Sequence, residues 1–401
     1  MPSLKKLFFA HVAQTSDFPL AIEVESAFES TIIDTNGKSY IDFDSGISVS
    51  SLGHRHPDVV KAITDQTARY MHTMVYGEHI QSPQVQYAAL LAETLDNGLD
   101  TVYFVNSGSE AVEAAIKLAR KATGRTEIIS AFNAYHGSTI GAESLRSDRD
   151  FTQYYMPVVP GIKHIRFNNL SDLSLISQET AAVIVEPIQA EAGIILPADE
   201  YLYALQKKCK EVGALFILDE IQTGFGRTGK LFAFEHYRVN PDVLLIAKAM
   251  GGGMPCGGLV ASAALMSTFM RNPALGHITT FGGHPVNIAA ALATLQFLTS
   301  TDTIPSSVDK ADYIYNQLIT HPMVKGIRYK GLFMAIELVT SCPLIPLITD
   351  MIQRGVLVDF FLFNATSFRI APPLIIEKKD LDTALSHIIA ALDHCYETSK
   401  I

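Results

Sequence analysis

Polar residues that can do chemistry stand at the ends of several short apolar runs in the sequence. Ser107 follows TVYFVN, Glu186 follows AAVIV, Asp219 ends ALFILD and Lys248 ends VLLIAK. In an α/β sheet, ligands bind beyond the carboxyl ends of the strands. Each residue could by itself belong to a turn, but the four together predict one site that contains a hydroxyl, two carboxylates and an amine.

Lys248 has the most distinctive chemistry of the four. A bare ammonium group is costly to bury, so a lone lysine at a strand end is often a side chain that reaches water. The functional interpretation is a nucleophile, because a lysine amine in a dry pocket has a lowered pKa and forms a Schiff base with an aldehyde. The glycines at 251–253 would let the backbone approach a bulky ligand closely.

Two further segments supply partners for such an amine. Asp219 is either a solvated or capping carboxylate, or the partner of a protonated pyridine nitrogen in pyridoxal phosphate (PLP). The turn Ser107-Gly108-Ser109 precedes a helical pattern, so it predicts an N-cap that could also bind a phosphate. It is neither a Walker loop nor a G-x-G-x-x-G fingerprint, which disfavours a dinucleotide-binding protein. Tyr135 could stack on a flat ring, or pack in the core.

The elements that must position these residues alternate between strands and helices from about residue 50 to 300. This rhythm predicts an α/β domain with a mostly parallel sheet. We expect a large domain at 49–300 and a smaller α+β domain at 301–401. An N-terminal segment, 1–48, contains a hairpin signal at Asn36-Gly37 and is expected to pack with the small domain.

Composition excludes several classes of partner. The 401 residues carry a formal net charge of −10, which argues against nucleic acid or an anionic membrane surface. No apolar run approaches membrane-spanning length, and the N-terminus lacks the pattern of a secretory signal. The four cysteines are scattered, so neither a metal site nor a disulfide framework is predicted, and the cytoplasm is the expected location.

Taken together, the motifs resemble those of the class III aminotransferases, the ornithine, acetylornithine and ω-amino-acid group of PLP enzymes. The resemblance covers nearly the whole chain and rests on GHRHP, NSGSEAVEAAIKLAR, YHGST, EPIQAEAG, LDEIQTGFGRTG, AKAMGGGMP, TTFGGHP and FRIAPPL, in the family's order. It implies the aspartate-aminotransferase-like fold, PLP as cofactor and a homodimer whose active sites are shared between subunits. The implied substrates are an amino donor and a 2-oxo acid acceptor, used in a ping-pong reaction.

The resemblance also implies roles for individual residues. Lys248 and Asp219 match the catalytic Schiff-base lysine and the pyridinium partner. The other implied cofactor-binding residues are Ser107, Gly108, Ser109, Tyr135, His136, Glu186, Gln222 and Thr280, the last reaching the phosphate of a neighbouring subunit. The implied substrate-binding residues are Arg369 for an α-carboxylate, Glu191 as its alternative partner, Tyr76 and Ser138.

One departure bears on the substrate. Ornithine- and acetylornithine-type members carry an arginine where this chain has Ser138, and a serine cannot bind a second carboxylate as an arginine does. YHGST is typical of ω-amino-acid and amine transaminases, whereas the Glu191 and Arg369 pair is typical of glutamate-using members. Acetylornithine or ornithine aminotransferase, an aminomutase, an epimerase, a decarboxylase and an idle PLP-binding protein stay open as alternatives, and so does the choice between pyruvate and 2-oxoglutarate.

Overall fold

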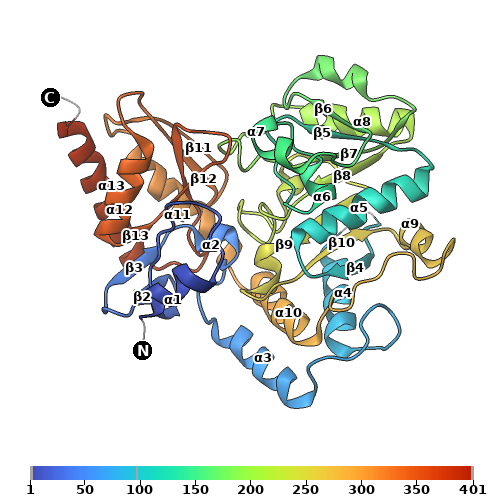
Figure 1. Ribbon diagram of the computed structural model, residues 1–401, viewed down its shortest axis with the longest axis horizontal. Helices are drawn as coiled ribbons and strands as arrows, with labels where there is room; N and C mark the ends of the chain where they lie inside the picture. Colours follow the sequence, from blue (N-terminus) through green and yellow to red (C-terminus); the bar gives the residue numbers. More distant parts are fainter. Residues whose placement is uncertain (1–2, 96–97, 399–401) are drawn as a thin grey trace.

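A seven-stranded sheet forms the centre of the larger part of the molecule (Figure 1). The computed structural model describes residues 3–95 and 98–398. In spatial order the strands are β4 (Thr101–Val105), β10 (Gly257–Ala261), β9 (Val243–Ala247), β8 (Leu215–Asp219), β7 (Thr180–Val185), β5 (Glu127–Ala131) and β6 (Ile162–Ile165). Strand β10 runs antiparallel to both of its neighbours, β4 and β9. The four pairs from β9 to β6 are parallel, so the sheet is mostly parallel, as the sequence predicts.

Both faces of this sheet are buried, which explains why its strands are continuous apolar runs. In β9, Val243 and Leu245 pack in one apolar cluster with α5 (Gly108–Thr123), while Leu244 and Ile246 pack in the opposite one. That second cluster includes residues of α8 (Tyr201–Val212) and α10 (Pro285–Ser300). Because successive residues of a strand are buried on opposite faces, a side chain can leave the core only where the strand ends.

Short helices and connections complete this part of the chain. Helices α3 (Pro57–Arg69) and α4 (Ser82–Thr94) pack against α10. The remaining helices are α6 (Ile140–Glu143), α7 (Arg149–Thr152), α9 (Ala263–Met266) and the 3-10 turns η1 (Gln153–Tyr155), η2 (Leu170–Leu175), η3 (Ala233–His236), η4 (Lys248–Gly251) and η5 (Ser267–Met270).

A second group of elements lies beside the large sheet, to the left in Figure 1. It contains two four-stranded sheets, β1-β2-β3-β13 and β11-β12-β15-β14. Their bounds are β1 (Val24–Phe28), β2 (Thr31–Asp34), β3 (Ser39–Asp42), β11 (Val324–Tyr329), β12 (Met334–Leu338), β13 (Val356–Leu357), β14 (Asp359–Phe360) and β15 (Ser367–Ile370). The helices of the N- and C-terminal segments are α1 (Leu4–His11), α2 (Ser45–Ser48), α11 (Thr303–Leu318), α12 (Leu344–Arg354) and α13 (Lys378–Thr398).

The N-terminal hairpin joins the C-terminal part of the chain through its second strand. Strands β2 and β3 are antiparallel around Asn36-Gly37, where Gly37 has a φ of 80° that favours glycine. Strand β3 then pairs in parallel with β13, with Ile41 opposite Val356. The exact domain boundaries at 48/49 and 300/301 stay a prediction.

The cysteines are all free, yet two of them are neighbours. Cys342 Sγ and Cys395 Sγ lie 2.6 Å apart, although 53 residues separate them in the chain. Their spacing in the sequence did not indicate this proximity. Among the described residues, no helix has the length and apolar character needed to cross a membrane.

Candidate active site

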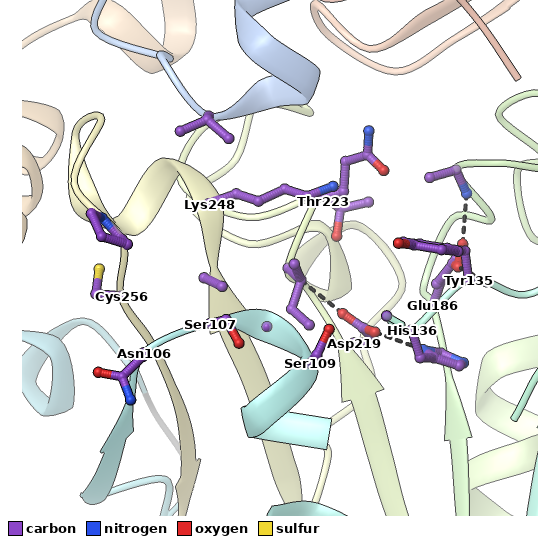
Figure 2. Close-up of a pocket in the computed structure, with 18 of the residues that line it drawn as sticks. Asn106, Ser107, Ser109, Tyr135, His136, Glu186, Asp219, Thr223, Lys248 and Cys256 are labelled. Atoms are coloured by element: carbon purple, nitrogen blue, oxygen red, sulfur yellow. Dashed lines mark hydrogen bonds and ion pairs between the residues drawn. The ribbon is translucent and has the colours of Figure 1, made fainter. Parts of the chain in front are cut away.

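A cavity of about 410 Å³ lies at the carboxyl ends of β4, β7, β8 and β9 (Figure 2). The four polar residues predicted to meet at this edge, Ser107, Glu186, Asp219 and Lys248, all line it. Five more of the predicted cofactor-binding residues do so as well: Gly108, Ser109, Tyr135, His136 and Gln222. The parallel arrangement of the strands therefore brings together side chains that lie far apart in sequence.

Lys248 leaves β9 in an unusual backbone conformation. Its φ is 47°, a left-handed value that few residues other than glycine adopt, and η4 begins at this residue. Figure 2 shows the side chain extending across the cavity. Burial lowers the pKa of the amine, which the charge of Glu191 partly opposes, and Nζ makes no hydrogen bond or ion pair within the described residues. The amine is thus desolvated and free to react.

Asp219 faces the cavity in a fixed orientation. One carboxylate oxygen lies 2.6 Å from His136 Nδ1, and the other accepts a hydrogen bond from the Ile221 amide at 2.9 Å. Burial alone would lower the pKa of His136, but the hydrogen bond and charge of Asp219, with the charge of Glu186, raise it overall. Asp219 and His136 therefore form a buried hydrogen-bonded pair, a contact that nothing in the two sequence segments indicates.

Glu186 holds two segments of the cavity wall together. Its carboxylate accepts hydrogen bonds from the Tyr135 amide at 3.0 Å and the Ala190 amide at 2.6 Å. Burial raises the pKa of this carboxyl to about 7; the charge of His136 opposes the shift and that of Asp219 adds to it. Glu186 therefore positions the Tyr135 loop.

We expect Glu186 to make the stability of the unliganded protein depend on pH. Its raised pKa means that the unfolded chain ionises first, so the unfolding free energy should fall as pH rises from about 4.5 to about 7. Glu186→Gln should remove this part of the slope, on the order of 2–3 kcal/mol. Chemical denaturation across this pH range measures it, with Glu211→Gln, at an exposed position, as control. An unchanged slope in Glu186→Gln would show that the carboxyl is ionised throughout.

The turn at Ser107-Gly108-Ser109 begins the sixteen-residue helix α5. Ser107 is the N-cap, since its Oγ accepts a hydrogen bond from the Glu110 amide at 3.2 Å. A Cβ on Gly108 would lie 2.8 Å from the Ile221 side chain, so this position needs glycine. The first turn of a helix presents backbone N–H groups and a positive dipole end, which suit a phosphate.

Arg369 and Glu191 form a buried ion pair beside this cavity. The Arg369 side chain is only 1% exposed; Nη1 lies 2.9 Å from Glu191 Oε1, and Nη2 donates to Oε2 at 3.1 Å. Two more carboxylates act on the guanidinium, because Asp359 Oδ2 lies 3.5 Å from Nη2 and the Asp44 charge reaches it as well. Burial raises the pKa of Asp44 to about 6. Glu191 is thus paired with the guanidinium that is predicted to bind a substrate α-carboxylate.

Besides Arg369 and Glu191, three more predicted site residues lie outside the cavity wall. Ser138 is exposed, with its Oγ 3.2 Å from the Tyr135 hydroxyl and its amide donating to Ser109 Oγ at 3.3 Å. Tyr76 lines a second cavity of about 310 Å³, together with Thr279. Thr280 is exposed. Within one chain, neither Tyr76 nor Thr280 lines the cavity that contains Lys248.

Several residues of the site were not predicted. The cavity wall also contains Val49, Asn106, Ile188, Ala190, Thr223, Met254, Pro255 and Cys256. Asp44 and Asp359, which surround Arg369, were missed too. A sequence signal for Asp44 is its place beside Phe43 in YIDFDSGI, where apolar and acidic residues alternate and an unpaired aspartate would be costly to bury.

The residues present fit PLP. Gln222 Nε2 is buried without a hydrogen-bond partner in the described part of the chain, so it is available to a ligand oxygen. The unpartnered Lys248 amine faces Asp219 across a cavity of a size typical for cofactors. These features define the class of PLP-dependent enzymes.

Comparison with known proteins identifies the family within that class. The model of the class-III aminotransferases matches residues 12–392, and the chain belongs to that family. An ornithine aminotransferase from Toxoplasma gondii, with PLP at partial occupancy in its active site, is 29% identical, with a TM-score of 0.90 over 99% of this chain and 95% of that one. An (S)-enantioselective ω-transaminase from Thermomicrobium roseum is 27% identical (TM-score 0.89, 98% of each chain). A transaminase from Virgibacillus is 26% identical (TM-score 0.91, 99% and 100%).

The predictions of fold, cofactor and enzyme class are therefore confirmed. The chain is a PLP-dependent aminotransferase with the α/β fold of that group. The relatives include both an ornithine aminotransferase and an ω-transaminase at nearly the same identity, so they do not by themselves identify the amino donor.

Proposed function

We propose that this aminotransferase moves an amino group from an ω-amino acid or amine to a 2-oxo acid in a ping-pong reaction. The observation that carries the proposal is the unpartnered Lys248 amine in a cavity that also contains the Asp219–His136 pair. When bound, PLP supplies a carbonyl that accepts the amino group and a ring that withdraws electrons from the substrate Cα.

The chain's own residues hold and orient the cofactor in this proposal. The turn at Ser107–Ser109 would bind the phosphate through backbone N–H groups and hydroxyls. Tyr135, which lines the cavity, would pack against the ring, and Gln222 Nε2, which has no partner within the described residues, would donate to a ring oxygen. Asp219 would hold the ring nitrogen, and His136 keeps the carboxylate in place.

Lys248 and the Arg369–Glu191 pair act on the substrate. The Lys248 amine removes a proton from the donor carbon that bears the reacting amine, and burial, which lowers the pKa of Lys248, favours the neutral form that can act as a base. Arg369 binds the α-carboxylate of the 2-oxo acid once Glu191 moves away. Glu191 keeps the guanidinium paired while a donor without an α-carboxylate is bound, since an unpaired buried guanidinium would be costly.

The proposal includes a homodimer in the cytoplasm. Thr280 is exposed and Tyr76 is partly exposed, away from the Lys248 cavity of the same chain, which leaves both available to a neighbouring subunit. Sedimentation equilibrium measures the mass of the assembly. Mixing Lys248→Ala with Thr280→Ala protein tests the shared site, because subunit exchange would form one site with neither substitution.

The reaction itself is tested with a panel of donors and two acceptors. Wild-type protein should release more than one equivalent of oxo product from an ω-amino acid or amine only when pyruvate or 2-oxoglutarate is supplied. Repeated turnover without any acceptor would indicate an aminomutase, an epimerase or a decarboxylase instead.

Substrate choice can be shifted at Ser138. Wild type should prefer an ω-amino acid or a simple amine to N-acetylornithine, because Ser138 offers no cation to the carboxylate that N-acetylornithine carries far from its reacting δ-amine. Ser138→Arg should shift preference towards substrates with a distal carboxylate by about 1.5–3 kcal/mol. The values of kcat/KM for N-acetylornithine, ornithine, a β-amino acid and a diamine measure this, with Thr139→Arg as the adjacent control. A wide wild-type preference for N-acetylornithine would contradict the role of Ser138.

A further inference from the structure

Arg146 is a buried cation that the proposed mechanism does not use. It lies between α6 and α7, and its side chain is 4% exposed. Three aromatic rings surround its guanidinium: the Cζ atom is 4.0 Å from the ring centre of Phe151, 5.3 Å from that of Phe363 and 5.6 Å from that of Tyr135. Cation–π contacts of this kind orient a guanidinium and shield it from water.

The charged neighbours of Arg146 do not occupy all of its hydrogen-bond donors. Nη1 lies 3.5 Å from Glu143 Oε1, and Nε donates to Asp148 Oδ2 at 3.3 Å. Nη2 is buried and has no hydrogen-bond partner within the described residues. Burial raises the pKa of the Glu143 carboxyl, while the charge of Arg146 opposes this shift. One edge of the guanidinium fork is left without an acceptor.

Arg146 also lies between the two parts of the active site. Tyr135 lines the cofactor cavity, and its hydroxyl is 3.2 Å from Ser138 Oγ. On the other side, the Phe363 amide donates to the Glu191 carbonyl at 3.0 Å, and Glu191 pairs with Arg369. The guanidinium thus contacts the loop that borders the ring position and the loop that borders the α-carboxylate position.

We propose that Arg146 binds the distal carboxylate of a 2-oxo dicarboxylic acid, so that the acceptor of this aminotransferase is 2-oxoglutarate rather than pyruvate. The inference rests on the proposed function and selects between its two acceptors. Arg369 binds the α-carboxylate, and Arg146 supplies the second cation that position 138 lacks. Nη2 is the donor available to it, and Phe151, a residue that is 40% exposed, is the one that would have to move aside to admit the carboxylate.

A purely structural role would give a different result. If Arg146 only supported Tyr135 and Phe363, its replacement would weaken every acceptor equally, because Tyr135 lines the cavity that either acceptor must enter and the Phe363 amide holds the backbone of Glu191. If Arg146 binds a distal carboxylate, only the acceptor that has this group should suffer. The ratio of kcat/KM for the two acceptors separates these cases.

The test uses full-length enzyme that has first taken up an amino group from a donor and has been separated from it. Single-turnover reactions with 2-oxoglutarate and with pyruvate then give kcat/KM for each acceptor. Arg146→Gln should lower the value for 2-oxoglutarate about 10- to 100-fold and that for pyruvate less than about threefold. Arg149→Gln, which removes an exposed cation three residues away, should change neither.

Each other outcome contradicts the inference. Equal losses for both acceptors would show a structural role, and no loss would show no role. If Arg146→Gln does not fold, Arg146→Lys keeps the charge but loses the fork, and should weaken 2-oxoglutarate alone. Wild-type enzyme should also be protected against thermal unfolding by glutarate more than by butyrate. Failure of wild type to react with either acceptor would instead contradict the proposed function.

Discussion

Lys248→Ala should abolish transamination while the protein still folds and binds PLP. The substitution removes the amine that lies without a partner in the cavity, and among the lysines that the structure describes no other lines that cavity. The proton on the donor carbon that bears the reacting amine then has no base positioned to take it. Loss of a positioned general base lowers the rate by about 10²–10⁴-fold, and loss of the nucleophile adds to this.

Two measurements check this result. Borohydride reduction of wild-type protein supplied with PLP should attach the cofactor to the peptide that contains Lys248, and peptide mapping identifies that peptide. Lys310→Ala is the matched control, because burial lowers the pKa of Lys310 too, yet its amine donates to the Leu374 carbonyl away from the cavity. Cofactor attached to a different lysine, or full activity in Lys248→Ala, would overturn the assignment.

Asp219→Asn should have the second largest effect. An amide has the shape of the carboxylate, and its oxygen can still accept the hydrogen bond from the Ile221 amide, while its NH2 group would face His136 as a donor. The fold should therefore persist, but the hydrogen bond that His136 makes to a carboxylate is lost. It carries no charge, so it cannot stabilise a protonated ring nitrogen, and the electron-withdrawing power of the ring falls. We expect the activation free energy to rise by several kcal/mol, which lowers kcat on the order of 10²-fold or more.

The loss should appear in kcat with little change in KM, because Asp219 is proposed to contact the cofactor and not the substrate. Asp242→Asn is the control: Asp242 is a carboxylate just before β9 that accepts a hydrogen bond from the Phe216 amide at 2.8 Å, at the opposite end of the strands from the cavity. That substitution should cost stability without a selective loss of kcat. Near wild-type turnover in Asp219→Asn would mean that another group serves the nitrogen.

The positions of Lys248, Asp219, Glu186 and Ser107 could be predicted from sequence because each depends on local patterns. Apolar runs of strand length fix where a strand ends, and parallel order places those ends at one edge. The helix from Gly108 to Thr123 was predictable for the same reason, since a serine N-cap and a left-handed Gly124 mark its limits.

Contacts between distant side chains could not be predicted in this way. The His136–Asp219 hydrogen bond spans 83 residues, and nothing in either segment indicates the other. The rings around Arg146 come from three separate segments, so its burial depends on how loops pack, not on periodicity. Asp359 reaches Arg369 because β14 and β15 place the two residues opposite each other, a register that only the folded chain defines.

The parallel pairing of β3 with β13 has a consequence for the order in which the chain folds during synthesis. Lys38, next to β3, donates to the Ile352 carbonyl, 314 residues later, so this sheet closes only when the ribosome has made nearly the whole chain. The large sheet can assemble earlier, because contacts over shorter loops form first. Until β13 arrives, β3 keeps an unpaired edge. Nascent or C-terminally truncated chains are therefore the forms of this protein in which aggregation through β3 is expected, and chaperones would act on them.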